Sequence, residues 1–137
     1  MLTISQEIYD AIVAHARKDH PYEACGIVAG PLGSDRAERF VPMINVEASM
    51  TFYNLEPYEK LRVWREMDDR DEEPVVVYHS HTSTEAYPSR SDIENADLET
   101  SHFVLVSTRD ADKLGDFQFR SFRIVNHEVT EEPVKVV

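Results

Sequence analysis

The stretch that decides the fold is the run PVVVYH, residues 74–79. It is uncharged, rich in β-branched residues and continuous rather than alternating, which is typical of a central strand buried on both faces. The run ends at His79, and His81 follows two positions later. Side chains at positions i and i+2 of an extended chain project to the same side. Both imidazoles can therefore face one point in space, which predicts half of a metal site at the end of this strand.

Helical and extended patterns alternate on either side of this strand. We expect helices over residues 6–19, 57–69 and 91–98, with Leu61 and Trp64 among the inward residues of the second. We expect further strands over residues 24–30, 39–44, 103–107, 117–125 and 128–135, and a loop over 80–89. Helices interleaved with apolar strands predict the α/β class. Because no repeat or linker divides the chain, we expect residues 1–137 to form a single domain.

Composition limits the classes of function. The 26 acidic and 14 basic residues give a formal charge of −12, which disfavours nucleic acid or an anionic membrane as the main partner. The sequence has no apolar run near the roughly 20 residues that span a bilayer, and its first residues do not resemble a secretory signal. The single cysteine, Cys25, cannot form an internal disulfide, and we expect it to be a small buried core residue. These features predict a cytoplasmic protein.

A third metal ligand can come from Asp92, which lies at the start of the helix predicted over residues 91–98. Two neutral imidazoles and one carboxylate suit Zn²⁺, and three protein ligands leave the fourth position to water. Zinc lowers the pKa of such a water from 15.7 to about 7, which makes hydroxide available at neutral pH. The same ligand set also suits non-haem Fe(II).

A hydrolase needs a base for the water and a donor for the oxyanion as well. Glu23 precedes the strand predicted over 24–30 and is a candidate to accept the water's proton and return it to the leaving amine. Ser89, three residues before Asp92, is a candidate oxyanion donor. Spacing alone does not bring Glu23 to the metal, and on its own it is a plain loop carboxylate. The remaining histidines are expected to be structural or on the surface: His15, His20, His102 and His127.

The string HSHT (79–82), then six residues, then SRSD (89–92), closely resembles the JAMM motif of the MPN+ (Mov34/PAD-1-like) zinc metalloproteases. That motif has an upstream Glu, then His-Ser-His-Pro, six residues and Ser-x-x-Asp. Thr82 stands where the common motif has proline, which would only stiffen the backbone. The similarity covers nearly the whole chain and implies an MPN/JAB-like domain with a mixed central sheet flanked by helices.

The same resemblance implies a role for each residue of the motif. It implies one Zn²⁺ ion bound by His79, His81 and Asp92. It also implies that Glu23 is the general base and that Ser89 helps to hold the oxyanion.

The longer string HSHTSTEAYPSRSD (79–92) looks like the actinobacterial Mec-type branch of that family. Members of this branch act on a small ubiquitin-fold sulfur-carrier protein and cleave the amide between its C-terminal glycine and a newly made cysteine. The resemblance therefore implies a peptidase or isopeptidase of cysteine biosynthesis, with the carrier's flexible Gly-Gly tail as substrate. Arg90 and Arg109 are candidates to bind the carboxylate of the departing cysteine.

Two other functions stay open on the sequence. A non-catalytic MPN scaffold would share the fold, but such modules usually lack the ligands, and all five positions of the motif are present here. A 2-His-1-carboxylate Fe(II) protein would use the same three ligands, but Glu23 and Ser89 would then have no task.

Overall fold

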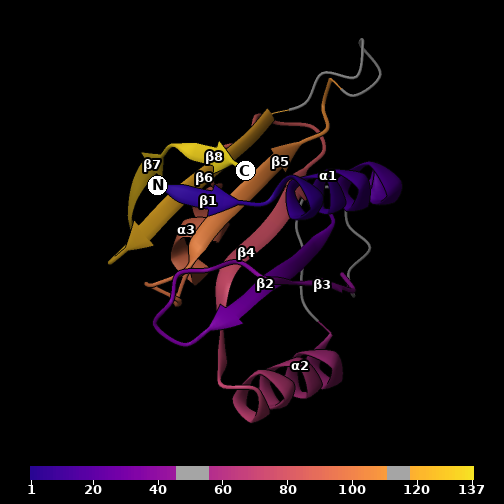
Figure 1. Ribbon diagram of the computed structural model, residues 1–137. Helices are drawn as coiled ribbons and strands as arrows, with labels where there is room; N and C mark the ends of the chain where they lie inside the picture. Colours follow the sequence, from indigo (N-terminus) through magenta and orange to yellow (C-terminus); the bar gives the residue numbers. More distant parts are fainter. Residues whose placement is uncertain (46–55, 111–117) are drawn as a thin grey trace.

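A computed structural model describes residues 1–45, 56–110 and 118–137 (Figure 1). Its elements are, in chain order, β1 (Leu2–Ile4), α1 (Gln6–Asp19), β2 (Cys25–Pro31), β3 (Arg39–Met43), α2 (Pro57–Asp69), β4 (Glu72–His81), α3 (Arg90–Asn95), β5 (His102–Ser107), β6 (Gln118–Val125), β7 (Glu128–Glu132) and β8 (Val134–Val136). None of the helices in the described ranges combines the length and the apolar composition that spanning a membrane requires.

A six-stranded sheet with the order β3-β2-β4-β5-β6-β7 forms the centre of the molecule. The β4–β5 pair is parallel and the other neighbours are antiparallel, so the sheet is mixed, as predicted. In Figure 1, β4 runs through the middle of the molecule between β2 and β5. The apolar run identified in the sequence is therefore a central strand, and its last residues lie at one end of the sheet.

One face of the sheet packs against α1 and the two-stranded parallel sheet β1–β8. Ser5 begins α1 by accepting a hydrogen bond from the Ile8 N–H, and the apolar stripe of the helix then lies on the sheet. From β4 this face receives Val76 and Tyr78, both fully buried. The intervening residues of β4 therefore project to the opposite face.

The opposite face is covered by α2 and by the segment that leads from β4 into α3. Val63 and Met67 of α2 pack with Ile27 and Val77 of the sheet. His79 and His81 have the same parity along β4 as Val77, so they share this face. The predicted ligands thus lie where α2, α3 and the end of β4 meet.

Several details of the predicted elements were wrong. One strand was predicted over residues 128–135, but β7 (Glu128–Glu132) and β8 (Val134–Val136) are separate strands in different sheets, and β1 was not predicted. The strand β4 continues to His81, because the Thr108 N–H donates to the His81 carbonyl at 2.9 Å, so the loop begins only at Thr82. The third helix is shorter than predicted and ends at Asn95. Leu61 is 49% exposed, because the inward stripe of α2 runs through Val63 and Met67.

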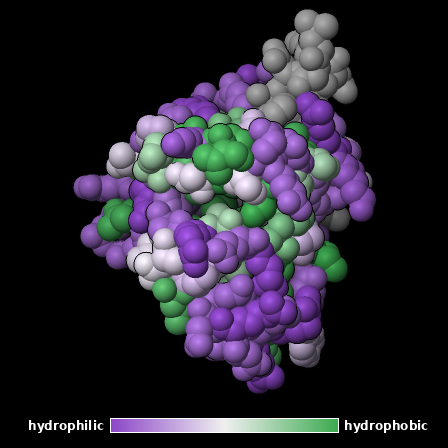
Figure 2. Space-filling model, viewed as in Figure 1, coloured by the Kyte–Doolittle hydropathy of each residue, from purple (hydrophilic) through white to green (hydrophobic). Residues whose placement is uncertain are grey.

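The molecular face seen in Figure 2 is mostly hydrophilic, and hydrophobic residues gather around a hollow near its centre. The hydrophilic surface agrees with the strongly acidic composition of the chain. Part of that charge is compensated locally, since Arg39 lies 2.8 Å from Glu66 and 2.8 Å from Glu72.

Candidate metal and catalytic site

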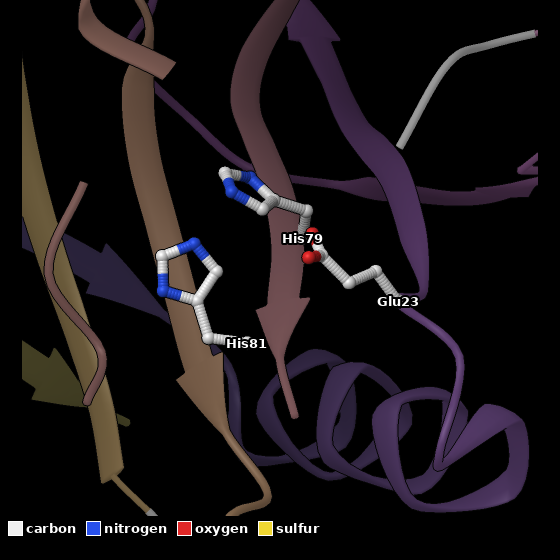
Figure 3. A group of neighbouring side chains, drawn as sticks. All are labelled: Glu23, His79 and His81. Carbon is white, nitrogen blue, oxygen red and sulfur yellow. The ribbon is translucent and has the colours of Figure 1, made fainter. Parts of the chain in front are cut away.

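Both histidines of the motif project from the end of β4 on the same side, and their rings lie 5.1 Å apart, centroid to centroid (Figure 3). They are 5% and 6% exposed, which is low for histidine and removes most competing water. Glu23 reaches toward them from the segment between α1 and β2. One ligand atom from each of these three residues lies within 4.8 Å of the other two. The fold therefore brings Glu23 to the histidines, which spacing in the sequence did not predict.

Asp92 completes the group from α3. Its Oδ2 lies 3.1 Å from His79 Nε2 and 3.2 Å from His81 Nε2. The local cause is a capping box: Ser89 Oγ accepts the Asp92 N–H at 3.1 Å, and Asp92 Oδ2 accepts the Ser89 N–H at 2.8 Å. This box fixes the first turn of α3 and directs the carboxylate back toward β4. The Ser-x-x-Asp spacing thus has two effects: it forms the cap of the helix, and it directs the Asp92 carboxylate toward the histidines.

The protonation of His81 is set by a backbone carbonyl. His81 Nδ1 lies 2.9 Å from Glu85 O, which can only accept, so Nδ1 carries the hydrogen. In the neutral ring Nε2 then presents a lone pair, and it faces the carboxylate of Asp92. Lone pairs and a carboxylate that point at one another need a proton or a cation between them. This donor set fits a cation.

The spacing of the donor atoms suits zinc. Ligand bonds of about 2.0–2.2 Å in tetrahedral geometry place neighbouring donor atoms roughly 3.3–3.5 Å apart. The two histidine-to-Asp92 separations, 3.1 and 3.2 Å, come close to this value. The residues present therefore fit a Zn²⁺ ion bound by two imidazoles and one carboxylate.

Electrostatics act differently on the three residues. Burial opposes charge on His81, but its hydrogen bonds to Asp92 and to Glu85 O outweigh burial and raise the pKa of His81. Without a metal, His81 therefore favours the protonated form that donates to Asp92, and a bound cation would take the place of that proton. Burial lowers the pKa of His79, so its ring is neutral near pH 7. Burial alone would raise the pKa of Asp92, but hydrogen bonds from His79, His81 and the Ser89 N–H hold that pKa well below its usual range. Asp92 is therefore a carboxylate throughout the physiological range.

Glu23 has the properties of a general base. Burial raises the pKa of Glu23 to about 7, and His81 and Asp92 act on it in opposite directions. A carboxyl group with a pKa near the working pH can both accept and return a proton. Its backbone is held as well, since Asn45 Nδ2 donates to Glu23 O at 3.1 Å.

A cavity of about 480 Å³ opens beside this group. His79, Ser89 and Asp92 line it at the site, Val77, Phe103 and Ile124 form an apolar wall, and Lys60 and Trp64 of α2 border it. A cavity of this volume lies within the range of ligand-binding clefts. Neither Arg90 nor Arg109 is among its lining residues.

The two arginines proposed from the sequence lie in ion pairs. Arg90 Nε lies 3.0 Å from Glu94, and the Arg90 side chain is 92% exposed. Arg109 pairs with its neighbour Asp110 at 3.3 Å. Sequence reasoning also missed two groups at the site, the carbonyl of Glu85 and the hydroxyl of Ser80, which accepts the Ala24 N–H at 2.8 Å. A backbone carbonyl has no sequence signal, and the sequence predicted Ser80 only as part of the loop over 80–89.

Comparison with known proteins identifies the family of the chain. The family model described as prokaryotic homologues of the JAB domain matches residues 5–125. The chain is 58% identical over 137 residues to the CysO-cysteine peptidase of Mycobacterium tuberculosis, covering 100% of this chain and 92% of the relative. It is 31% identical over 100 residues to the desampylase of Haloferax volcanii, covering 69% of this chain and 72% of that protein.

A solved structure also resembles the whole fold. A protein from Desulfitobacterium hafniense, determined in solution, superposes with a TM-score of 0.82 at 27% identity and covers 100% of this chain and 93% of its own. The match of the family model and this structural neighbour agree with the α/β fold and its mixed sheet. The chain therefore belongs to the prokaryotic JAB (MPN-type) family and is a peptidase of that family.

Proposed function

We propose that this peptidase is zinc-dependent and hydrolyses the amide that follows the C-terminal glycine of a ubiquitin-fold sulfur-carrier protein, releasing cysteine. The observation that carries the proposal is the convergence of His79 Nε2 and His81 Nε2 on Asp92 Oδ2, at 3.1 and 3.2 Å. The choice of substrate is supported by the 58% identical relative, whose name gives CysO-cysteine as what it cleaves.

His79, His81 and Asp92 would hold the ion. When bound, Zn²⁺ with three protein ligands supplies a water of lowered pKa and polarises the substrate carbonyl. Glu23 takes the proton of the attacking water and returns it to the nitrogen of the departing cysteine. Burial raises the pKa of Glu23 above its ordinary value, and this favours both transfers at neutral pH.

Ser89 can combine its capping role with an oxyanion role. Its Oγ accepts the Asp92 N–H at 3.1 Å, which uses a lone pair and leaves the hydroxyl hydrogen to be donated. Ser89 also lines the cavity, so that hydrogen can reach the carbonyl oxygen of a bound substrate. Donors of this kind are worth about 10²–10³ in turnover elsewhere.

We further propose that the carrier's tail lies in the 480 Å³ cavity, with its two glycines beside His79 and Ser89. Glycines there let the backbone approach the ligands closely, while the preceding residues meet the apolar wall. Arg90 and Arg109 stay candidates for the carboxylate of the leaving cysteine, each having to exchange its present acidic partner for the substrate.

We also propose that residues 1–137 act as one domain in the cytoplasm. Cys25 is the chain's single cysteine and is fully buried in β2, which suits a protein that does not depend on an oxidising compartment.

The test is to incubate the zinc-loaded protein with a carrier–cysteine adduct and to follow the mass of the carrier. Loss of one cysteine, abolished by a chelator and restored by zinc, is the expected result. Glu23→Gln should keep the zinc and lose the cleavage, which separates an enzyme from a binding scaffold. Absence of cleavage by the zinc-loaded wild type would overturn the proposal. Reconstitution with Fe(II) in place of zinc tests the oxygenase alternative, which predicts oxygen consumption.

A further inference from the structure

We propose that Gln118 is a positioning residue for the metal ligand His81, acting through the peptide bond between Glu85 and Ala86. The inference rests on the proposed zinc site. Gln118 lies at the start of β6, far from the JAMM motif in sequence, and nothing in its sequence context connects it with a metal.

The contact runs through a single peptide plane. Gln118 Oε1 accepts the Ala86 N–H at 2.9 Å, and Glu85 O accepts from His81 Nδ1 at 2.9 Å. The Ala86 N–H and the Glu85 C=O belong to the same planar peptide unit, in which they point in opposite directions. Holding the N–H therefore sets the direction of the C=O, and the C=O sets the tautomer and the orientation of the His81 ring.

Other contacts hold the same segment in place, and one of them acts on the carbonyl side of this plane, since the Tyr87 N–H donates to Glu85 O at 2.8 Å. Ser107 Oγ donates to Thr84 O at 2.6 Å. Ala86 is fully buried and packs with Leu105 and Phe122. Ser107 and Gln118 are register partners in the β5–β6 pair, so both side chains leave the sheet on the same face and reach the segment together. Of these contacts, the bond from Gln118 is the one made to the N–H side of the Glu85–Ala86 peptide.

Without an acceptor at position 118, the buried Ala86 N–H has to find another partner. Burying an unpaired backbone N–H is unfavourable, so the peptide is expected to rotate toward water or toward another acceptor. Rotation carries the Glu85 carbonyl away from His81 Nδ1. The ring then loses the bond that keeps its hydrogen on Nδ1 and its lone pair on Nε2, the atom that faces Asp92. Loss of such partners behind a metal ligand typically weakens metal affinity by roughly 10–100-fold.

The role that Gln118 plays requires only an oxygen acceptor of the right length, and this gives matched variants. Gln118→Met removes the acceptor at nearly constant shape, and Gln118→Lys removes it while keeping a polar side chain on the surface. Gln118→Glu keeps the acceptor. The chain has one other glutamine, Gln6, which donates to Asp10 on the exposed side of α1, so Gln6→Met is the control for the substitution itself.

Two readouts decide the matter. Zinc affinity is measured by competition with a chelator, and the tautomer of His81 is read from ring ¹⁵N chemical shifts of the metal-free protein at a pH high enough for the ring to be neutral. We expect Gln118→Met and Gln118→Lys to bind zinc about tenfold or more weakly. We also expect both to lose the pure Nδ1–H signal of His81, while Gln118→Glu and Gln6→Met behave as wild type.

The outcomes separate this inference from the proposed function. Wild-type affinity in both Gln118→Met and Gln118→Lys, together with an unchanged His81 tautomer, would overturn the role of Gln118 and leave the zinc site standing. A wild type that binds no zinc, but whose His81 tautomer still depends on Gln118, would support the positioning role and refute the proposed metal chemistry. If the metal-free Gln118→Met and Gln118→Lys variants also unfold at a lower midpoint, their weaker zinc binding reflects a general loss of folding, and this would count against the proposal. An equal loss of zinc affinity in Gln118→Glu and Gln118→Lys would also count against it.

Discussion

Ser80 and Ala24 exchange two hydrogen bonds: the Ser80 N–H donates to Ala24 O at 3.0 Å, and Ser80 Oγ accepts the Ala24 N–H at 2.8 Å. Ser80 stands between the two histidines of β4, and Ala24 follows Glu23 directly. These two hydrogen bonds therefore hold the segment that carries Glu23, the proposed base, against the end of β4 that carries His79 and His81. The middle residue of the His-Ser-His string thus has a structural task.

Ser80→Ala should leave the buried Ala24 N–H without its acceptor. We expect a loss of about 1–3 kcal/mol in the free energy of unfolding, because a buried donor left unsatisfied costs this much. We also expect a fall in kcat/KM, because Glu23 is no longer held against β4. Urea unfolding and cleavage kinetics measure the two effects. Ser83→Ala, in the exposed part of the following loop, is the control and should change neither.

The raised pKa of Glu23 predicts a pH dependence of stability in the metal-free protein. The folded-state pKa is about 7 and the ordinary value is 4.5. The stability that the protonated carboxyl group contributes is therefore fully present below pH 4.5 and is lost as the pH rises through 7. Glu23→Gln removes this loss. Relative to wild type, the variant should gain about 2.5 kcal/mol in the free energy of unfolding between pH 5 and pH 8, from 1.36 kcal/mol per pKa unit. Unfolding at the two pH values in the presence of a chelator checks this, and an equal difference at both would contradict it.

Gly26 is predicted to tolerate no side chain. It lies opposite Tyr78 in the β2–β4 register, and an added Cβ would come within 2.6 Å of the Tyr78 ring. The ring cannot move away easily, because the Tyr78 hydroxyl is 2.7 Å from His15 Nδ1. Gly26→Ala should therefore lower the free energy of unfolding by about 1–3 kcal/mol. Combining it with Tyr78→Phe should cost less than the sum of the two changes, and strict additivity would contradict this account.

Cys25 is predicted to be chemically inert in the folded protein. Burial raises the pKa of its thiol to about 12, with Glu59, Asp19 and Glu23 adding to the shift. The thiolate needed for alkylation is therefore scarce at pH 8. A thiol reagent should modify Cys25 only after unfolding in urea, and rapid modification of the native protein would contradict the burial described here.

The parts of the site that depend on local sequence could be predicted, and those that depend on distant pairing could not. The orientation of His79 and His81 follows from the period of two along a strand, and the position of Asp92 follows from a capping box with Ser89. The approach of Glu23 depends on the pairing of β2 with β4, which no local pattern encodes.

The same distinction explains the errors in the predicted elements. The strand β1 has three residues and exists because it pairs with β8, at the other end of the chain. The helix α2 is charged and has few apolar residues, so its sequence is compatible with an inward stripe through Leu61 or with one through Val63 and Met67. Packing on the sheet buries Val63 and Met67.

X-ray absorption at the zinc edge of the reconstituted protein tests the central claim most directly. We predict one zinc per chain, bound by two imidazole nitrogens and by oxygen ligands at about 2.0–2.2 Å, with one oxygen contributed by water. His79→Ala should remove one imidazole from this shell. A sulfur ligand, a fourth side chain closing the sphere, or failure to bind zinc at all would contradict the account.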